Sequence, residues 1–178
     1  TVMDYEGRIV GIVGQAGEKS GNLCLNRASE SPRQPGSSIK PLSTYSLALE
    51  KDYINWSSMI LNYAIYHNGK LWPQNSDGTH GSKKNVTVQY AIQKSFNTVP
   101  VRIITEMLGV NEAYNFMKKT FHLSTLDDTN DASIAPLATG SLTNGVTTVE
   151  MAAAYAVFGN NGYYYKPYCY YKVTNATG

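Results

Sequence analysis

The sequence predicts an α/β protein of the α+β type, in which an antiparallel sheet is flanked by helices. The 178 residues are 42% hydrophobic and 16% charged, which suits a single globular domain with a buried core. Apolar runs at residues 2–5 and 9–13 flank a turn that contains Gly7, a pattern typical of a β-hairpin. Helical spacing of apolar residues recurs between Ser37 and Val157, so helices should follow these strands.

The first long helix is predicted to begin at Ser37 or Ser38. Residues 14–36 are rich in Gly, Ser, Asn and Pro and should form a loop longer than the usual ~4–6 residues, either functional or mobile. Gly36 follows a proline and does not suit a helix interior, whereas Pro41 is tolerated only in a first turn, which together define the start. The apolar stripe of this helix would consist of Leu42, Tyr45, Ala48 and Leu49.

The middle of the chain should change from irregular to helical structure. Residues 51–85 contain many Gly, Asn and Asp residues and are expected to have little regular structure. A helix over residues 87–93 should be broken by the triplet Ser95-Phe96-Asn97, and a new helix should run from Thr98 to Gly109. Asn111 is placed to cap the helix after that.

The last third of the chain should begin with a helix and end in a sheet. Residues 147–150 match a capping box, and the helix that follows should present small alanines to the core until Gly159 ends it. Residues 163–173 are rich in strand formers, and residues 174–178 suggest the turn of a hairpin.

Composition excludes several kinds of partner. The charge balance is 15 basic against 13 acidic residues without a basic run, so we expect no nucleic-acid partner. No stretch approaches the ~18–20 apolar residues of a membrane span. No His, Cys or acidic residues stand at metal-ligand spacing, and we expect no metal or other cofactor. Cys24 and Cys169 fit two free thiols, and a disulfide between them stays open.

Ser37 and Lys40 form a candidate pair of nucleophile and base. Side chains at positions i and i+3 of a helix share one face, and a serine hydroxyl needs an adjacent base to react at neutral pH. A lysine can accept a proton only if burial or positive potential lowers its pKa. A solvent-facing cap with a surface lysine also fits this short pattern. The residues around it favour the catalytic interpretation, because Arg33–Gly36 and Pro41 specify a sharp transition from loop to helix.

Ser95, Asn97 and Trp72 are the further candidate site residues. A helix–break–helix with Phe96 as a buried anchor would direct Ser95 and Asn97 into a cleft, where a serine can relay a proton and an asparagine can bind a substrate amide. The same triplet fits a plain helix end followed by a cap. Trp72, with its neighbours up to Asn75, fits either the lining of a groove or a buried loop anchor.

Together these patterns resemble the transpeptidase domain of class A (bifunctional) penicillin-binding proteins. That family carries an S-x-x-K motif and an S-x-N triplet, here Ser37–Lys40 and Ser95–Asn97. The most specific part of the resemblance is the run Arg33–Ser37. The other matching segments are Met3-Asp4, Gly7, Ile9-Val10, Val13-Gly14, Asn26–Ala28, Trp72–Asn75, Ala91–Asn97, Gly145–Gly162 and Lys166-Pro167.

The resemblance implies the penicillin-binding protein and β-lactamase fold and a role for each residue. Ser37 would attack the penultimate D-Ala carbonyl of a peptidoglycan stem peptide, and Lys40 would take its proton. Ser95 would help to pass a proton to the departing D-Ala. Asn97 and Trp72 would bind the substrate. An amino group of a neighbouring stem would resolve the acyl-enzyme, and β-lactams would acylate the same serine.

One departure from the family pattern shapes the expected domain organisation. The family's Lys-Thr-Gly triplet is absent, and Lys118–Phe121 does not supply it. Residues 1–178 are therefore expected to be the N-terminal portion of a single transpeptidase domain, completed by the C-terminal remainder as a second polypeptide. The family also implies an extracytoplasmic bacterial location, with the membrane reached only through an N-terminal anchor outside this chain.

Two other function classes stay open. A D,D-carboxypeptidase or a serine β-lactamase of the same fold would form the same acyl-serine and release it with water. A non-catalytic penicillin-binding or sensor module would keep the fold without turnover. Rapid turnover of a penicillin would favour the β-lactamase, and covalent labelling that is lost in Ser37→Ala would exclude the non-catalytic module.

Overall fold

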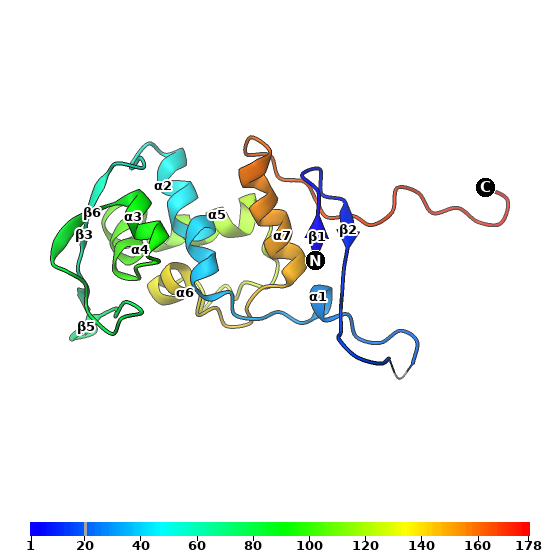
Figure 1. Cartoon of the computed structure of the whole chain (residues 1–178), viewed down its shortest axis with the longest axis horizontal. Helices are drawn as coiled ribbons and strands as arrows, with labels where there is room; N and C mark the ends of the chain where they lie inside the picture. The colour runs from blue at the N-terminus through cyan, green and yellow to red at the C-terminus, as the bar shows by residue number, and fades with distance from the viewer. Residues whose placement is uncertain (20) are drawn as a thin grey trace.

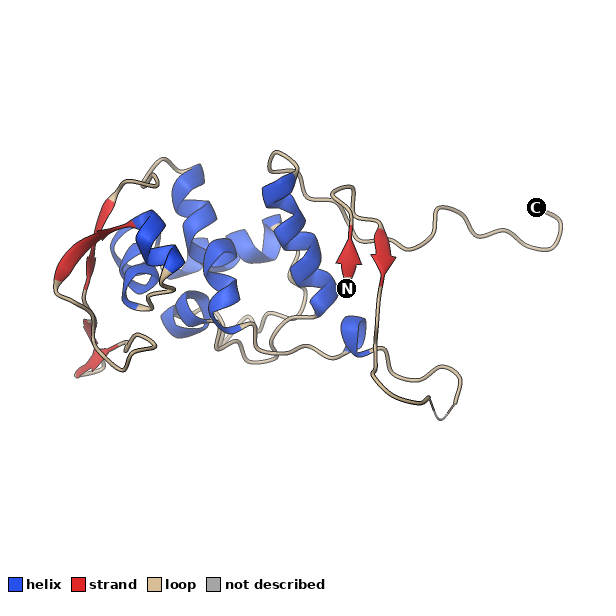
Figure 2. Cartoon of the chain, viewed as in Figure 1, coloured by secondary structure: helices blue, strands red, loops and turns tan. Residues whose placement is uncertain are grey.

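The computed structural model describes residues 1–19 and 21–178. Its helices form one body, and the N-terminal hairpin lies at one end of this body (Figure 1). The last residues of the chain extend away from the same end. Short strands lie at both ends of the helical body (Figure 2). This combination of helices with small antiparallel sheets confirms the predicted α+β class.

The strands are short, and each sheet of the described residues has two of them. They are β1 (Val2–Met3), β2 (Ile9–Gly11), β3 (Met59–Asn62), β4 (Ile65–His67), β5 (Lys70–Trp72) and β6 (Lys84–Thr87). All pairs are antiparallel: β1 with β2, β3 with β6, and β4 with β5. The β1–β2 hairpin is the predicted one, and β1 packs beside α7.

The helices supply most of the core. They are α1 (Arg27–Glu30), α2 (Ser46–Glu50), α3 (Val88–Gln93), α4 (Thr98–Ile103), α5 (Val110–Thr120), α6 (Ile134–Thr139) and α7 (Thr148–Ala156). Two 3₁₀ turns, η1 (Gly36–Ile39) and η4 (Val157–Gly159), and two π-helical turns, η2 (Pro41–Tyr45) and η3 (Ile104–Leu108), join them. The largest fully buried side chains are Phe121, Ile39, Leu42, Ile103, Ile104, Met117, Leu123, Leu137, Leu142, Val88, Val99 and Val101.

The predicted helix boundaries with strong local signals are confirmed. The helical segment that carries Lys40 begins with η1, one residue before Ser37. Thr87 caps α3, and α4 starts at Thr98. The capping box of α7 is formed by Thr147 and Glu150, each bonding to the backbone of the other. Proline, glycine and capping side chains act within a few residues, so the sequence displays these signals directly.

Two predictions of secondary structure were wrong in the middle of the chain, and one helix was missed. Residues 51–85 contain β3, β4, β5 and the start of β6, because Asn62 of β3 pairs with Lys84 across a long connection that no local pattern reveals. Asn111 does not cap α5, because Gly109 takes the N-cap position with a φ of 85°. No prediction covered α6, a helix that contains Pro136.

The predicted C-terminal strand was also wrong. Within residues 163–173 only Tyr168 makes a bridge, and this bridge is parallel to Arg8. Tyr163, Tyr170 and Tyr171 are each at least 66% exposed. Tyrosine favours strands because it packs on a pleated surface, so this propensity has no effect where the neighbouring surface is missing. Residues 175–178 form a turn, in which the Gly178 N–H donates to the Asn175 carbonyl oxygen at 3.1 Å.

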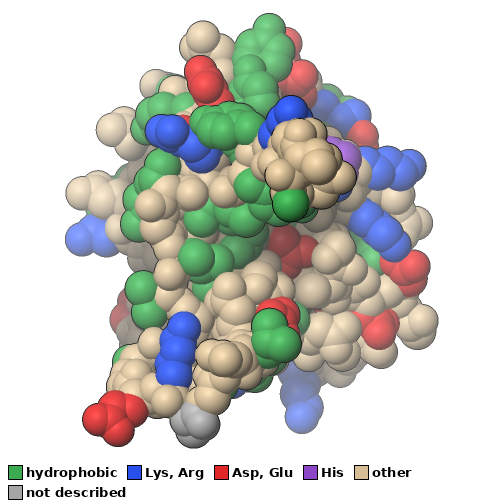
Figure 3. Space-filling view, turned by 90° about the vertical axis from the view of Figure 1, so that its right-hand side faces the viewer, with side chains coloured by type: hydrophobic (Ala, Val, Ile, Leu, Met, Phe, Trp, Pro, Cys, Tyr) green, Lys and Arg blue, Asp and Glu red, His purple; other side chains and the backbone are tan. Residues whose placement is uncertain are grey.

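Apolar side chains gather at the hairpin end of the molecule, around a hollow that Figure 3 shows. A cavity of about 670 Å³ lies there between β2, α1, α7 and the C-terminal segment. Its lining includes the apolar side chains of Ile9, Ile12 and Val149 and the ring of Tyr168. Val10 and Val13 beside it are 53% and 74% exposed, so this end presents a largely apolar surface.

Candidate active site

Ser37 lies on the exposed side of η1. The segment before it is not entirely a loop, contrary to the prediction for residues 14–36, because α1 lies within it. Gly36, the first residue of this turn, has a φ of 54°, a conformation that glycine adopts without steric cost. The backbone N–H of Lys40 donates to the carbonyl oxygen of Ser37 and closes the turn. In a 3₁₀ turn residues i and i+3 are eclipsed, so Ser37 and Lys40 share one edge of the helix.

Lys40 is buried, with only 2% of its surface exposed. Its Nζ donates to the carbonyl oxygen of Ser95 at 2.8 Å, to Ser95 Oγ at 3.3 Å and to Asn97 Oδ1 at 2.6 Å. Burial lowers the pKa of Lys40 to about 8, because the low-dielectric interior disfavours its charged form. A sizeable fraction of this amine is therefore neutral near physiological pH, as a general base requires.

The structure brings Lys40, Ser95 and Asn97 together through hydrogen bonds, but the Ser37 side chain does not join this hydrogen-bonded group in the described residues. Among the hydrogen bonds of residues 1–19 and 21–178, none involves the Ser37 hydroxyl. The three acceptors around Nζ match the three donors of an ammonium group. A neutral amine has only two N–H donors and a lone pair, so it can donate to only two of these three acceptors. In the longest contact, with Ser95 Oγ at 3.3 Å, the Ser95 hydroxyl can then donate to the lone pair of Lys40 Nζ.

The Ser95–Asn97 triplet forms the predicted break between α3 and α4. Ser95 has a φ of 52°, and the N–H groups of Ser95 and Phe96 still bond back to α3 carbonyls at 3.0 and 3.1 Å. The Phe96 ring packs against the core and meets the Tyr90 ring edge-on at 5.8 Å. The Phe96 ring is only partly buried and not the fully buried anchor that the sequence suggested, but Ser95 and Asn97 both contact Lys40 as predicted.

A groove of about 510 Å³ adjoins Asn97. Its lining includes Trp72, Gln74, His80 and Thr139. Asn97 Nδ2 donates to the carbonyl oxygen of Gln74 at 2.7 Å, while its Oδ1 accepts from Lys40. Trp72 is half-buried and packs partly against the core, so it combines the two alternatives considered from the sequence, groove lining and anchor.

A second segment, residues 140–146, packs against the residues that precede Ser37. The backbone of Arg33 pairs with that of Val146 through two bonds of 2.9 Å, and Gly140 lies against Gly36. Tyr155 of α7 donates its hydroxyl to the carbonyl oxygen of Ser38 at 2.7 Å. The loop-to-helix transition at Ser37 is thus held by contacts with residues about a hundred positions away.

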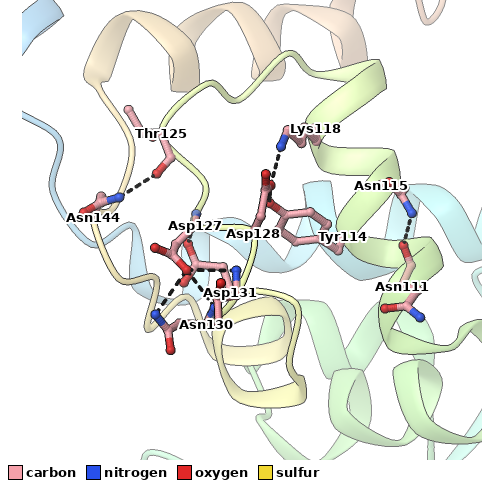
Figure 4. Close-up of polar contacts among 11 residues, drawn as sticks. Asn111, Tyr114, Asn115, Lys118, Thr125, Asp127, Asp128, Asn130, Asp131 and Asn144 are labelled. Carbon is pink, nitrogen blue, oxygen red and sulfur yellow. Dashed lines mark hydrogen bonds and ion pairs between the residues drawn. The ribbon is translucent and has the colours of Figure 1, made fainter.

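This supporting segment is itself fastened to the loop after α5 (Figure 4). Asn144 Nδ2 donates to the carbonyl oxygen of Thr125 at 3.1 Å, and Thr125 Oγ1 donates to the carbonyl oxygen of Gly145 at 2.6 Å. The fully buried Asp131 accepts from the N–H and hydroxyl of Thr143, both at 2.8 Å. These contacts give residues 140–146 a fixed position relative to the core.

Sequence reasoning missed Asn62, Gly140 and Tyr155, and it treated Asn75 only as a loop or groove residue. Asn62 and Asn75 are buried at 3% and 5% exposure beside the Ser95–Asn97 break. A buried asparagine in a short strand has no signature in a single sequence. The one available signal was the run Trp72–Asn75, which the family resemblance had already singled out.

The described residues show no other type of centre. In this part of the chain, no three His, Cys, Asp or Glu side chains come close enough to hold a metal ion. Both cysteines are free and exposed. Of the helices that the structure describes, none is long and apolar enough to cross a bilayer.

Comparison with known proteins identifies close relatives of this chain. A family model of the penicillin-binding protein transpeptidase domain matches residues 1–177. Penicillin-binding protein 1A of Clostridium tetani is 36% identical over all of the chain, and penicillin-binding protein 4 of Bacillus subtilis is 36% identical over 86% of it. The chain spans about a quarter of the length of these relatives, 24% of each.

Solved structures share the fold. The PonA1 protein from Mycobacterium tuberculosis in complex with penicillin V superposes with a TM-score of 0.67 at 18% identity, covering 82% of this chain and 39% of that one. Penicillin-binding protein A from the same organism, an imipenem acyl-enzyme complex, gives a TM-score of 0.62 at 20% identity, covering 80% of this chain and 36% of its own.

Proposed function

Because the chain belongs to the penicillin-binding protein transpeptidase family, we propose that it carries the acyl-serine chemistry of a peptidoglycan D,D-transpeptidase. The observation that carries the proposal is the Lys40 amine. It is buried, its pKa is lowered to about 8, and it contacts both polar members of the Ser95–Asn97 triplet one turn after Ser37.

Acylation begins with neutral Lys40. Ser37 Oγ attacks the carbonyl carbon of the penultimate D-Ala of a stem peptide, and Lys40 Nζ takes the hydroxyl proton. The carbonyl oxygen becomes an oxyanion, which a backbone N–H at the start of the helix stabilises. When the intermediate collapses, the C–N bond breaks, and Ser95 passes the proton from Lys40 to the amine of the departing D-Ala. Asn97 and Trp72 hold the peptide in the groove.

Transfer repeats these steps in reverse order. The amino group of a neighbouring stem attacks the Ser37 ester, loses a proton to Lys40, and forms a new amide as Ser37 Oγ leaves with that proton. A β-lactam enters at the same point, because its strained amide presents the same carbonyl carbon to Ser37. Its ring opens when the C–N bond breaks, but the nitrogen stays attached to the acyl group.

Labelling with a fluorescent penicillin tests the role of Ser37. The label should appear on the peptide that carries Ser37 in mass spectrometry, and Ser37→Ala should abolish it. The neighbouring variant Ser38→Ala is the matched control and should still be labelled. Labelling should be measured with the chain alone and with a polypeptide that carries a Lys-Thr-Gly strand, and its absence from both samples contradicts the proposal.

The rate of deacylation separates the alternatives of the same fold. A transpeptidase keeps the penicilloyl group for long periods, whereas a serine β-lactamase hydrolyses it and turns over the drug. A D,D-carboxypeptidase releases D-Ala from a stem-peptide analogue with water even when no acceptor amine is present. A non-catalytic penicillin-binding or sensor module would not be labelled covalently through Ser37 and would process neither substrate.

Residues 1–178 are proposed to be the N-terminal portion of one transpeptidase domain, which a second polypeptide with the Lys-Thr-Gly strand completes at the apolar hairpin end. The apolar hollow beside β2 supports this proposal, since extended apolar surface is unusual on a monomeric protein. A monodisperse, stable 178-residue species without a partner would contradict it.

The family also suggests an extracytoplasmic location at the bacterial membrane, which fractionation of cells that produce the whole protein would test.

A further inference from the structure

A buried polar network stands behind the Ser95–Asn97 triplet, and none of the proposed catalytic steps uses it. It consists of Asn62 from β3, Asn75 from the loop after β5, and Thr98, the first residue of α4. These residues are 3%, 5% and 0% exposed. Buried amides are costly unless they are hydrogen-bonded, so the contacts of these side chains define their position.

Asn75 supplies hydrogen bonds at the start of α4. Its Oδ1 accepts from the N–H of Asn97 at 2.7 Å and from the N–H of Thr98 at 3.3 Å. The first backbone N–H groups of a helix have no partner within the helix and need one from elsewhere. Asparagine at an N-cap commonly supplies such a bond with its own side chain. Asn97 occupies the N-cap of α4 but makes no such bond.

Because Asn75 accepts hydrogen bonds from the backbone N–H groups of Asn97 and Thr98, the Asn97 carboxamide does not have to cap the helix and is available for the active site. Its Oδ1 accepts from Lys40 Nζ at 2.6 Å, and its Nδ2 donates to the carbonyl oxygen of Gln74 at 2.7 Å. Gln74 is the neighbour of Asn75, so one short segment holds Asn97 through both its backbone and its side chain.

Asn62 fixes the orientation of Asn75. Its Oδ1 accepts from Asn75 Nδ2 at 3.2 Å and from Thr98 Oγ1 at 2.6 Å. With Nδ2 committed to Asn62, the Oδ1 of Asn75 must face the N–H groups of α4. Gly81 closes the far side, where a side chain would approach the Asn62 carbonyl oxygen to 2.4 Å.

We propose that Asn75, oriented by Asn62, is a positioning residue that holds Asn97 against the Lys40 amine and keeps that amine out of water. The proposal rests on the proposed function only in giving this amine a part in acylation. Asn75 does not contact Ser37 or Lys40 in the hydrogen bonding of the described residues, so its effect is transmitted through the Ser95–Asn97 loop.

Titration of the Lys40 amine tests the proposal without any need for acylation. The wild-type chain is produced with isotope-labelled lysine, and the Lys40 resonance is assigned by its loss in Lys40→Arg. Its midpoint in the wild type should lie near 8. In Asn75→Ala the loop loosens and water reaches Nζ, so the midpoint should rise by about 1 unit toward the ordinary lysine value. An unchanged midpoint in folded Asn75→Ala overturns the proposal.

Two further variants separate positioning from general loss of stability. Leu123→Ala removes a fully buried core side chain outside the network, and it should lower the melting temperature without moving the Lys40 midpoint. If Leu123→Ala moves the midpoint as far as Asn75→Ala does, the shift reflects destabilisation and the proposal is wrong. If Asn75→Ala does not fold, Asn62→Ala decides by the same readout, with a smaller rise expected.

Penicillin labelling of the same variants connects the titration to the chemistry. In Asn75→Ala the pH at which labelling reaches half its maximal rate should rise together with the Lys40 midpoint. If no penicillin labels the wild-type chain, either alone or with the polypeptide that carries the Lys-Thr-Gly strand, the proposed function is refuted, but the Lys40 titration still decides whether Asn75 positions the amine.

Discussion

A methyl group on Gly140 would lie 2.0 Å from the carbonyl oxygen of Gly36, the residue before the proposed nucleophile. Gly140 ends α6 with a φ of 78°, and its N–H donates to the carbonyl oxygen of Pro136 at 3.0 Å. The close contact requires glycine for two separate reasons, the positive φ and the lack of space. The end of α6 therefore determines where the turn that carries Ser37 can lie.

Gly140→Ala should slow acylation of Ser37 as well as destabilise the chain. The methyl group must push the Gly36 backbone away, and a displacement of this kind at a reacting group can reduce the rate by about 10- to 100-fold. The combined strain should lower the free energy of unfolding by about 1–3 kcal/mol. The rate of labelling by a fluorescent penicillin, quenched at set times, measures the effect on acylation. Thermal unfolding measures the loss of stability.

Gly69→Ala is the matched control for this variant. Gly69 has almost the same φ, 76°, but a side chain there would meet nothing within 4 Å. Gly69→Ala should lower the free energy of unfolding by about 1–2 kcal/mol, because alanine is strained at a positive φ, and it should leave labelling unchanged. Equal labelling rates for the two variants would show that the Gly140–Gly36 contact does not control the nucleophile.

The rate of acylation should rise with pH up to a midpoint near 8. Lys40 can take the Ser37 proton only when neutral, and burial lowers its pKa to about 8. Below this midpoint the rate should increase about tenfold for each pH unit, and above it the rate should level off. A labelling profile that rises through 10 and beyond would mean that Lys40 behaves as an ordinary exposed lysine. A profile that falls as the pH rises from 7 would mean that a protonated group drives the step.

Asn97→Asp should move that midpoint upward. The new carboxylate would replace an amide oxygen that lies 2.6 Å from Lys40 Nζ, and a nearby negative charge favours the protonated amine. A shift of about 1–3 units is expected, so labelling at pH 7 should fall by at least about tenfold. Asn85→Asp, on the exposed part of β6, adds the same charge away from the site and should leave the profile unchanged.

The parts of the site that the sequence predicted are those with local signals. Pro35, Gly36 and Pro41 mark a loop that becomes a helix, so the start at Ser37 could be found from neighbouring residues alone. The break between α3 and α4 could also be found locally, from the polar triplet that begins at Ser95. The lowered pKa of Lys40 could be expected as a requirement of the chemistry, but the acceptors that surround the amine come from residues 95 and 97, more than fifty positions away.

The parts that the sequence did not predict depend on contacts between distant segments. Asn62 acquires its role only because β3 pairs with β6 and places it beside Asn75. Gly140 is one of fifteen glycines, and its importance comes from the approach of Gly36, which no pattern of spacing shows. The tyrosines after Gly162 suggested a strand by propensity, yet propensity cannot supply the neighbouring strand on which pairing depends.

Tyr155→Phe tests whether α7 holds the Ser37 turn through a single hydrogen bond. The Tyr155 hydroxyl donates to the carbonyl oxygen of Ser38 at 2.7 Å, and the variant removes this donor while keeping the ring. Because one hydrogen bond contributes about 0.5–1.5 kcal/mol net, unfolding should require less free energy by that amount, and labelling should slow by less than about tenfold. Tyr170→Phe, at a side chain that is 67% exposed, is the control and should change neither quantity. A loss of labelling as complete as that expected for Ser37→Ala would instead give the Tyr155 hydroxyl a direct part in the chemistry.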